Sequence, residues 1–106
     1  MITCRCFVQA GQISADTETV LRANLDAFSQ QTFGMPTEIS WTTVPEGSGF
    51  TAAKPSTASM VVMRADKPLE QAHRATLLQE LCDLWMSETN CAISEVVAII
   101  SDPEAH

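Results

Sequence analysis

The amino terminus alternates between apolar and polar side chains over residues 2–10, which is typical of a half-buried β-strand. Successive side chains of a strand point to opposite faces, so the two sets separate. The predicted inner face holds Ile2, Cys4, Cys6 and Val8. The other face holds Thr3, Arg5, Phe7 and Gln9, and Gly11 ends the segment.

A first helix is predicted over residues 15–32 because Val20, Leu21, Leu25 and Phe28 recur at helical spacing. Ser14 is the expected N-cap. Gly34 and Pro36 follow the last turn, where a left-handed residue and then a proline commonly end a helix.

A second helix is predicted over residues 68–88, again from the recurrence of apolar residues. Asp66 is the expected N-cap, with Pro68 in the first turn. Asn90 stands where a left-handed closing residue is needed.

Three further strands are predicted, over residues 38–44, 58–64 and 95–101. The last is so continuously apolar that we expect it to be buried on both faces. Residues 45–57 hold two glycines and two prolines and are predicted to form one long loop.

The predicted element order, β-α-β, loop, β-α-β, gives an α/β (α+β) protein of one domain over residues 1–106. Two folds share this order: a ferredoxin-like sandwich, and two βαβ units related by a pseudo-twofold axis, with halves at about residues 1–44 and 58–101. The long loop between the halves is unsuited to a tight hairpin, which favours the second fold.

Composition narrows the class of function. The chain has six Lys plus Arg against thirteen Asp plus Glu, a net charge of −7, and 45% hydrophobic residues. Nucleic acids and anionic membrane surfaces need a dense basic patch, so neither is expected as a partner. The apolar content of so short a chain suggests that partner subunits cover part of it.

The cysteines suggest a compartment. No secretion signal and no run of about 18 apolar residues is present, so we expect a cytoplasmic protein with reduced thiols. Cys4 and Cys6 would share one strand face, but Cys82 and Cys91 follow no ligand spacing, so structural burial is favoured over a metal site. His73 is expected on a solvated helix face, and no cofactor is predicted.

The sequence resembles the tautomerase superfamily, the group around 4-oxalocrotonate tautomerase and macrophage migration inhibitory factor. The resemblance covers nearly the whole chain, and it lies in the strand at the amino terminus, the turn at residues 44–47 and the loop at residues 49–57. It continues through Pro68-Leu69 and Asp102-Pro103. It implies two fused βαβ units assembled as a homotrimer.

The resemblance also implies an amino-terminal proline as a general base and basic side chains that hold a substrate carboxylate. In this chain Met1-Ile2 occupies the start, Gln12 and Ser40 fall where the arginines would be, and Met35 falls at a lysine position. The chain thus keeps the scaffold and replaces the usual catalytic set.

Met1 is the catalytic candidate. Ile2 is too large for methionine removal, so we expect the terminal amine to be that of Met1. An amine in an apolar pocket is held in its neutral form and can act as a base or as a Schiff-base nucleophile. The alternative is an ordered terminus without chemistry.

Arg64, Lys54 and Arg5 are candidates to hold a substrate carboxylate, because an anionic ligand needs a compensating charge. The alternative for each is a solvated charge at the rim of the molecule. Phe50 and Trp41 are candidate pocket walls, although aromatic side chains more often belong to a core or an interface. Two functions remain open: a keto–enol isomerase of small 2-oxo or enol acids, and a trimeric binding protein without turnover.

Overall fold

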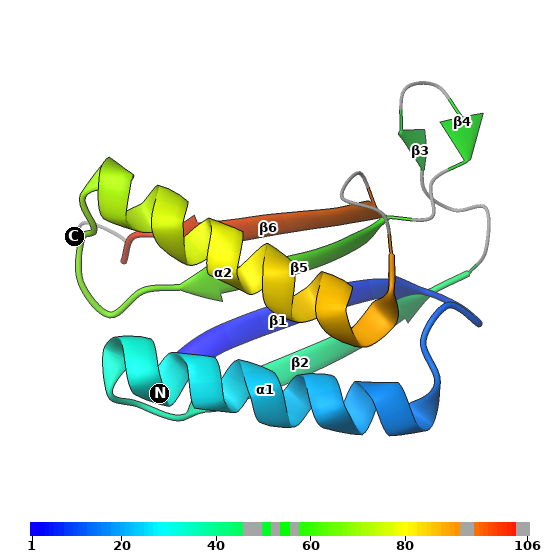
Figure 1. Ribbon diagram of the computed structural model, residues 1–106, viewed down its shortest axis with the longest axis horizontal. Coiled ribbons are helices and arrows are strands. Elements are labelled where there is room, and N and C mark those ends of the chain that lie inside the picture. The colour runs from blue at the N-terminus through cyan, green and yellow to red at the C-terminus, as the bar shows by residue number, and fades with distance from the viewer. Residues whose placement is uncertain (46–49, 52–53, 56–57, 92–94, 104–106) are drawn as a thin grey trace.

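Four long strands form one sheet in the computed structural model (Figure 1), which describes residues 1–45, 50–51, 54–55, 58–91 and 95–103. The main elements follow the predicted order: β1 (Ile2–Gln9), α1 (Ala15–Phe33), β2 (Thr37–Val44), β5 (Ser59–Arg64), α2 (Gln71–Thr89) and β6 (Val96–Ser101).

The sheet joins two βαβ units through its two central strands. The strand order is β2-β1-β5-β6. Within each unit the strands are parallel, β1 with β2 and β5 with β6, whereas β1 and β5 meet antiparallel. The predicted class and βαβ units are confirmed, and the two parallel pairs distinguish this fold from the ferredoxin-like alternative.

Both helices cover the same face of the sheet and run antiparallel to each other (Figure 1). The core lies between the helices and this face, as the alternation in β1 predicts. Its fully buried side chains are Ile2, Cys4, Cys6, Leu21, Leu25, Val61, Met63, Leu81 and Trp85. The opposite side of the sheet, the open face, is not covered by either helix.

Three of the predicted helix-end residues are confirmed. The Ser14 side chain accepts a hydrogen bond from the Thr17 N–H at 3.2 Å. Gly34 ends α1 with φ 71°, and Asn90 ends α2 with φ 57°, both left-handed. Each closing residue donates its backbone N–H four residues back, to Gln30 and Met86 respectively.

The predicted start of the second helix is wrong. α2 begins at Gln71, after the N-cap Glu70, so neither Asp66 nor Pro68 belongs to its first turn. The Leu69 N–H donates instead to Asp102 Oδ1 at 3.1 Å, just beyond the end of β6. A bond to the neighbouring strand therefore holds this segment extended where local sequence favours a helix.

The connection at residues 45–57 contains two short strands, β3 (Phe50–Thr51) and β4 (Lys54–Pro55), where we predicted only loop. They pair antiparallel. Residues 46–47 of the 44–47 turn lie outside the described residues. Figure 1 places the β3–β4 pair at the end of the molecule opposite the two chain termini.

The prediction that the last strand is buried on both faces is wrong for the single chain. β6 is an edge strand, and helix α2 covers only one of its faces. On the open face Val97 is 44% exposed and Ile99 is 40% exposed. The continuous apolar run therefore reflects one buried face and one apolar surface.

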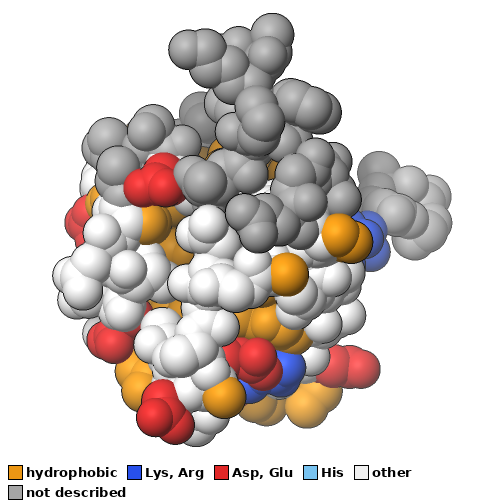
Figure 2. Space-filling model, turned by 90° about the vertical axis from the view of Figure 1, so that its right-hand side faces the viewer, with side chains coloured by type: hydrophobic (Ala, Val, Ile, Leu, Met, Phe, Trp, Pro, Cys, Tyr) orange, Lys and Arg blue, Asp and Glu red, His pale blue; other side chains and the backbone are white. Residues whose placement is uncertain are grey.

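The surface agrees with the acidic composition. At the end of the molecule that carries the β3–β4 pair, Figure 2 shows acidic side chains scattered among white and orange atoms, with few basic ones. Among the described residues, neither helix combines the length and the apolar character needed to cross a bilayer.

Candidate functional site

Two of the predicted cations meet at a hollow on the open face. This arginine hollow has a volume of about 260 Å³ and is lined by Thr3, Arg5, Val62, Arg64 and Ser101. Its residues come from β1, β5 and β6, at the end of the sheet where β1 begins and the other two strands end. Two guanidinium groups with hydroxyl neighbours form an environment suited to a carboxylate.

The sheet register explains how Arg5 enters this hollow. In β1 its inward neighbours Cys4 and Cys6 are buried, so Arg5 points to the open face. Its Cα partners are Ser40 in β2 and Val62 in β5. Arg5 is therefore adjacent to Ser40, the position where the resemblance implies an arginine.

Met1 lies at the same end of the sheet, next to the first residue of β1. It is 73% exposed, so a single protomer does not enclose it. The chain beside it is fixed, since the Ile2 N–H donates to the Pro36 carbonyl at 3.0 Å. The terminus is thus anchored near the arginine hollow but is not in an apolar pocket of its own chain.

Lys54 and Phe50 are not brought to the arginine hollow by their own chain. Their backbones belong to β4 and β3, at the far end of the molecule from the amino terminus (Figure 1). Their side chains lie outside the described part of the structure.

Trp41 belongs to the opposite side of the sheet from Arg5. Its Cα partner is the buried Cys6, and its ring stacks on that of Trp85 at 5.9 Å between centroids and 21° between planes. The Arg22 guanidinium carbon lies 5.5 Å from the Trp41 ring centroid. Trp41 thus packs against the core, away from the arginine hollow.

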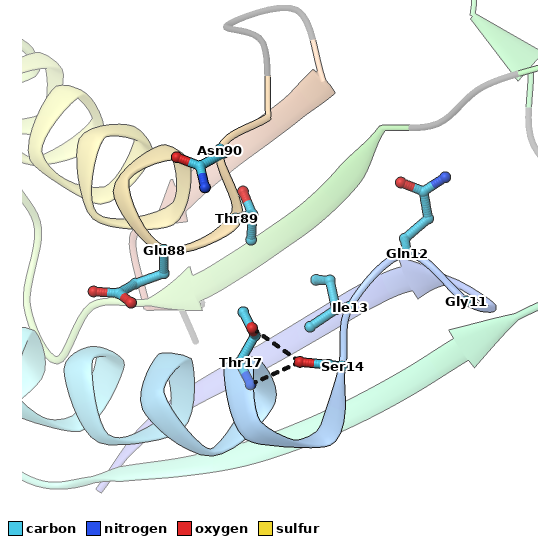
Figure 3. A pocket seen from close by; sticks show the side chains of 8 residues that line it. All are labelled: Gly11, Gln12, Ile13, Ser14, Thr17, Glu88, Thr89 and Asn90. Carbon is cyan, nitrogen blue, oxygen red and sulfur yellow. Dashed lines mark hydrogen bonds between the residues drawn. The ribbon is translucent and has the colours of Figure 1, made fainter.

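A second hollow lies between the ends of the two helices (Figure 3). This polar hollow has a volume of about 490 Å³. Gln12 and Ile13 lie on one side of it, in the turn after β1, and Thr89 and Asn90 lie on the other, at the end of α2. Gly11, Ser14, Thr17 and Glu88 complete the lining.

Most polar groups of the polar hollow are already satisfied. Ser14 Oγ donates to Thr17 Oγ1 at 3.0 Å, and Thr89 Oγ1 donates to the Trp85 carbonyl at 2.8 Å. Glu88 accepts from Asn24 Nδ2 at 3.2 Å and is the only charged residue among the described residues of the lining. With Gln12 in place of an arginine, the described lining of this hollow offers no cation to a carboxylate.

The cysteine pair is part of the core. Cys4 and Cys6 are fully buried, with Sγ atoms 3.9 Å apart. The hydrogen bond with Cys4, together with burial, raises the pKa of Cys6. Among the described residues no group of three or more His, Cys, Asp or Glu side chains is placed to hold a metal ion.

Some lining residues were not anticipated from the sequence. Thr3 could have been found from the alternation that pairs it with Arg5, but Ser101 requires the register between β5 and β6. In the polar hollow, Ser14 and Asn90 were predicted as helix ends. Only the antiparallel packing of the helices brings them to one place.

Comparison with solved structures identifies the fold. No protein-family model and no curated protein matches the chain. "Crystal Structure of Native Ps01740" matches with a TM-score of 0.88 and 22% identity over 97% of this chain and 95% of that one. Pt0534 inactivated by 2-oxo-3-pentynoate matches with a TM-score of 0.82 and 20% identity over 95% and 85%.

Two further matches are more distant in sequence. A fused 4-OT solved as a wild-type symmetric trimer has a TM-score of 0.83 and 13% identity over 95% of this chain and 85% of that one. N1, a member of the cis-3-chloroacrylic acid dehalogenase family, has a TM-score of 0.79 and 13% identity over 95% and 74%. The chain therefore has the tautomerase-superfamily fold, as the resemblance predicted.

Proposed function

We propose that this protein is a keto–enol isomerase of small 2-oxo or enol acids that works as a homotrimer, with the Met1 amine in the role of the family's proline. The observation that carries the proposal is the arginine hollow, which holds Arg5 and Arg64 at the sheet end where Met1 lies. The adjacency of Arg5 and Ser40 supports it, because Arg5 supplies a cation beside the position where the resemblance implies one.

In this proposal Arg5 and Arg64 bind the carboxylate of the substrate through charge-assisted hydrogen bonds. Ketonisation of an enol acid removes a proton from the enol hydroxyl and adds one to the neighbouring carbon. The neutral Met1 amine takes up the first proton, and the resulting ammonium delivers the second. Lys54 and Phe50 enter the site only as contributions from a neighbouring copy.

The homotrimer is supported by the open face. Val97 and Ile99 expose apolar surface there, on the strand that forms the edge of the described sheet, and partner copies would remove both from water. The fused 4-OT of the same fold was solved as a symmetric trimer. We also propose a cytoplasmic location, which agrees with the four free thiols.

The second candidate is a trimeric protein that binds a small carboxylate without turnover. It is favoured by the exposure of Met1, because the terminus of the single chain is not enclosed in the apolar pocket that the isomerase requires. Gln12 in the polar hollow also favours the binding protein, since it stands in place of an arginine that would give a second carboxylate contact.

The test is ketonisation of phenylenolpyruvate, followed by ultraviolet absorbance. We expect Arg5→Gln to lower kcat/KM by about 10- to 150-fold, the value of a hydrogen bond to a charged group. Lys67→Gln removes an exposed cation that does not line the hollow, and it should leave the rate unchanged.

Acetylation of the Met1 amine separates the two candidates. If the protein is the proposed isomerase, acetylation abolishes turnover while saturable binding of phenylpyruvate remains. The second candidate is supported by a different result. In that case the unmodified protein turns over substrate only at the background rate, and it binds phenylpyruvate in a way that requires Arg5. An insertion of proline between Met1 and Ile2 that restores turnover would show that only the base has been lost.

A further inference from the structure

Arg5 is a charged residue beside an apolar part of the open face. The residues paired with it across the sheet, from β1 toward the β6 edge, are apolar. Its Cα partner in β5 is Val62, and the partner of Val62 in β6 is Ile99. The next row is Phe7, Met60 and Val97, of which Met60 is 39% exposed. A partner that covers this apolar surface and extends across the sheet to β1 also covers Arg5.

The nearest charge on the same strand pair is of the same sign. Arg64 is two residues beyond Val62 in β5, which places it diagonally across from Arg5 at about 7–8 Å between Cα atoms. Glu38 lies on β2 opposite Thr3. In the described part of the structure Arg5 forms no salt bridge, with Glu38 or with any other carboxylate.

A desolvated guanidinium is costly unless an anion pairs with it. A carboxylate bound at Arg5 removes this cost, so it binds more tightly to the assembled protein than to the separate chain. By thermodynamic linkage, each bound ligand then strengthens assembly by the same factor by which assembly strengthens binding at its site.

We propose that a small carboxylate bound at Arg5 is an assembly ligand: it links occupation of the arginine hollow to association of copies through the open face. This inference rests on the carboxylate site and the homotrimer of the proposed function, but not on turnover or on Met1. A free chain binds the ligand weakly, and the ligand converts it to the trimer.

The test measures molar mass by light scattering over a dilution series. The probe is phenylpyruvate, compared with 1-phenyl-2-propanone, which lacks the carboxylate, at ionic strength matched with sodium chloride. If three sites per trimer bind only after assembly, phenylpyruvate at about ten times its Kd lowers the half-dissociation concentration about thirty-fold. The neutral ketone and the salt alone should leave it unchanged.

Variants distinguish this linkage from other causes. Arg5→Gln should form the trimer at lower protein concentration without ligand and should lose the response to phenylpyruvate. Lys67→Gln should respond as the wild type does. If Glu38→Gln dissociates the trimer and phenylpyruvate has no effect on the wild type, Glu38 of another copy is the counter-charge and the inference is wrong.

Should the trimer persist at the lowest measurable concentration, subunit exchange with an isotope-labelled copy, followed by native mass spectrometry, provides the readout. Phenylpyruvate should slow exchange, and an unchanged exchange rate would overturn the inference. A protein that stays monomeric with ligand overturns it too. If phenylpyruvate promotes assembly but the protein shows no turnover, only the isomerase proposal is refuted. If the protein shows turnover but assembles equally well without ligand, only the linkage is refuted.

Discussion

Cys4 and Cys6 show how far a residue's surroundings decide its chemistry. Their spacing on one strand face invites a metal or redox reading, yet both side chains are fully buried between the sheet and the helices. A thiol reacts as the thiolate, and burial in an apolar core opposes that form. Alternation in β1 was enough to predict this burial from the sequence.

The cysteines should therefore differ in reactivity. With iodoacetamide at about pH 7.5, we expect Cys91 to be alkylated first, and Cys82 more slowly because burial raises its pKa. Cys4 and Cys6 should react only after unfolding. Peptide mass spectrometry over time measures the order, and alkylation of Cys4 in the native protein would contradict it.

At the same scale, the sequence did not predict the role of Asp26. Its carboxylate accepts from the Thr37 backbone N–H at 2.8 Å and from Gln30 Nε2 at 2.7 Å. The backbone bond from Thr37 is the main cause that lowers the pKa of Asp26. A hydrogen bond between a helix and the following strand depends on the conformation of the turn between them. Local sequence patterns do not determine that conformation.

Elements begin and end where the backbone conformation allows. Gly34 and Asn90 were predictable because left-handed positions favour these residue types. The start of α2 was not, since Asp102 comes from a different element, 33 residues away from Leu69 in the chain. The local preference of Asp66 and Pro68 for a helix start is overridden there by a tertiary hydrogen bond.

A β-carbon at the closing residue of α1 should destabilise the protein. Gly34→Ala places alanine at φ 71° and should lower the free energy of unfolding by about 1 kcal/mol, although no neighbour clashes. Asn90→Gly at the end of α2 is the matched variant, and its unfolding free energy should stay the same or rise slightly. Urea unfolding followed by circular dichroism measures both.

The bonds from Leu69 and Arg74 to Asp102 should make stability depend on pH. The Leu69 N–H, and then Arg74 at 2.6 Å, hold the pKa of Asp102 below its ordinary value of 3.8. Because the native pKa is lowered, this contribution is complete well above 3.8 and is lost as the pH falls through the native value.

Asp102→Asn should therefore lower the urea midpoint at about pH 7, and its difference from the wild type should shrink as the pH falls below 3.8. Asp66→Asn removes an exposed carboxylate from the nearby turn and should leave the midpoint unchanged. A difference for Asp102→Asn that persists undiminished in acid would argue against the carboxylate as its source.

For the whole molecule, the sequence predicted the two βαβ units and the fold class. It did not predict that the helices cover one face of the sheet and leave the other face open. The apolar run in β6 is the same whether a helix, a second sheet or a partner copy covers it. The arginine hollow was equally hidden, because two registers bring its residues together: the antiparallel register of β1 with β5 places Arg5 near Arg64, and the parallel register of β5 with β6 places Arg64 beside Ser101.

A charge on the open face should prevent assembly. We expect Val97→Asp to reduce the solution mass from about three times 11.5 kDa to that of one chain, with circular dichroism retained. Val20→Asp on α1 is the matched variant, since Val20 is 42% exposed and Val97 is 44% exposed. Equal masses for both variants would place the interface elsewhere.

The stacking of Trp41 on Trp85 makes the protein its own optical reporter. The chain contains only these two tryptophans, one on β2 and the other on α2. Because the two indole centroids are only 5.9 Å apart, we expect their electronic transitions to couple and to give a paired circular dichroism band that neither ring has alone. Loss of that band marks the moment at which the second helix leaves the sheet of the first βαβ unit, without any added label.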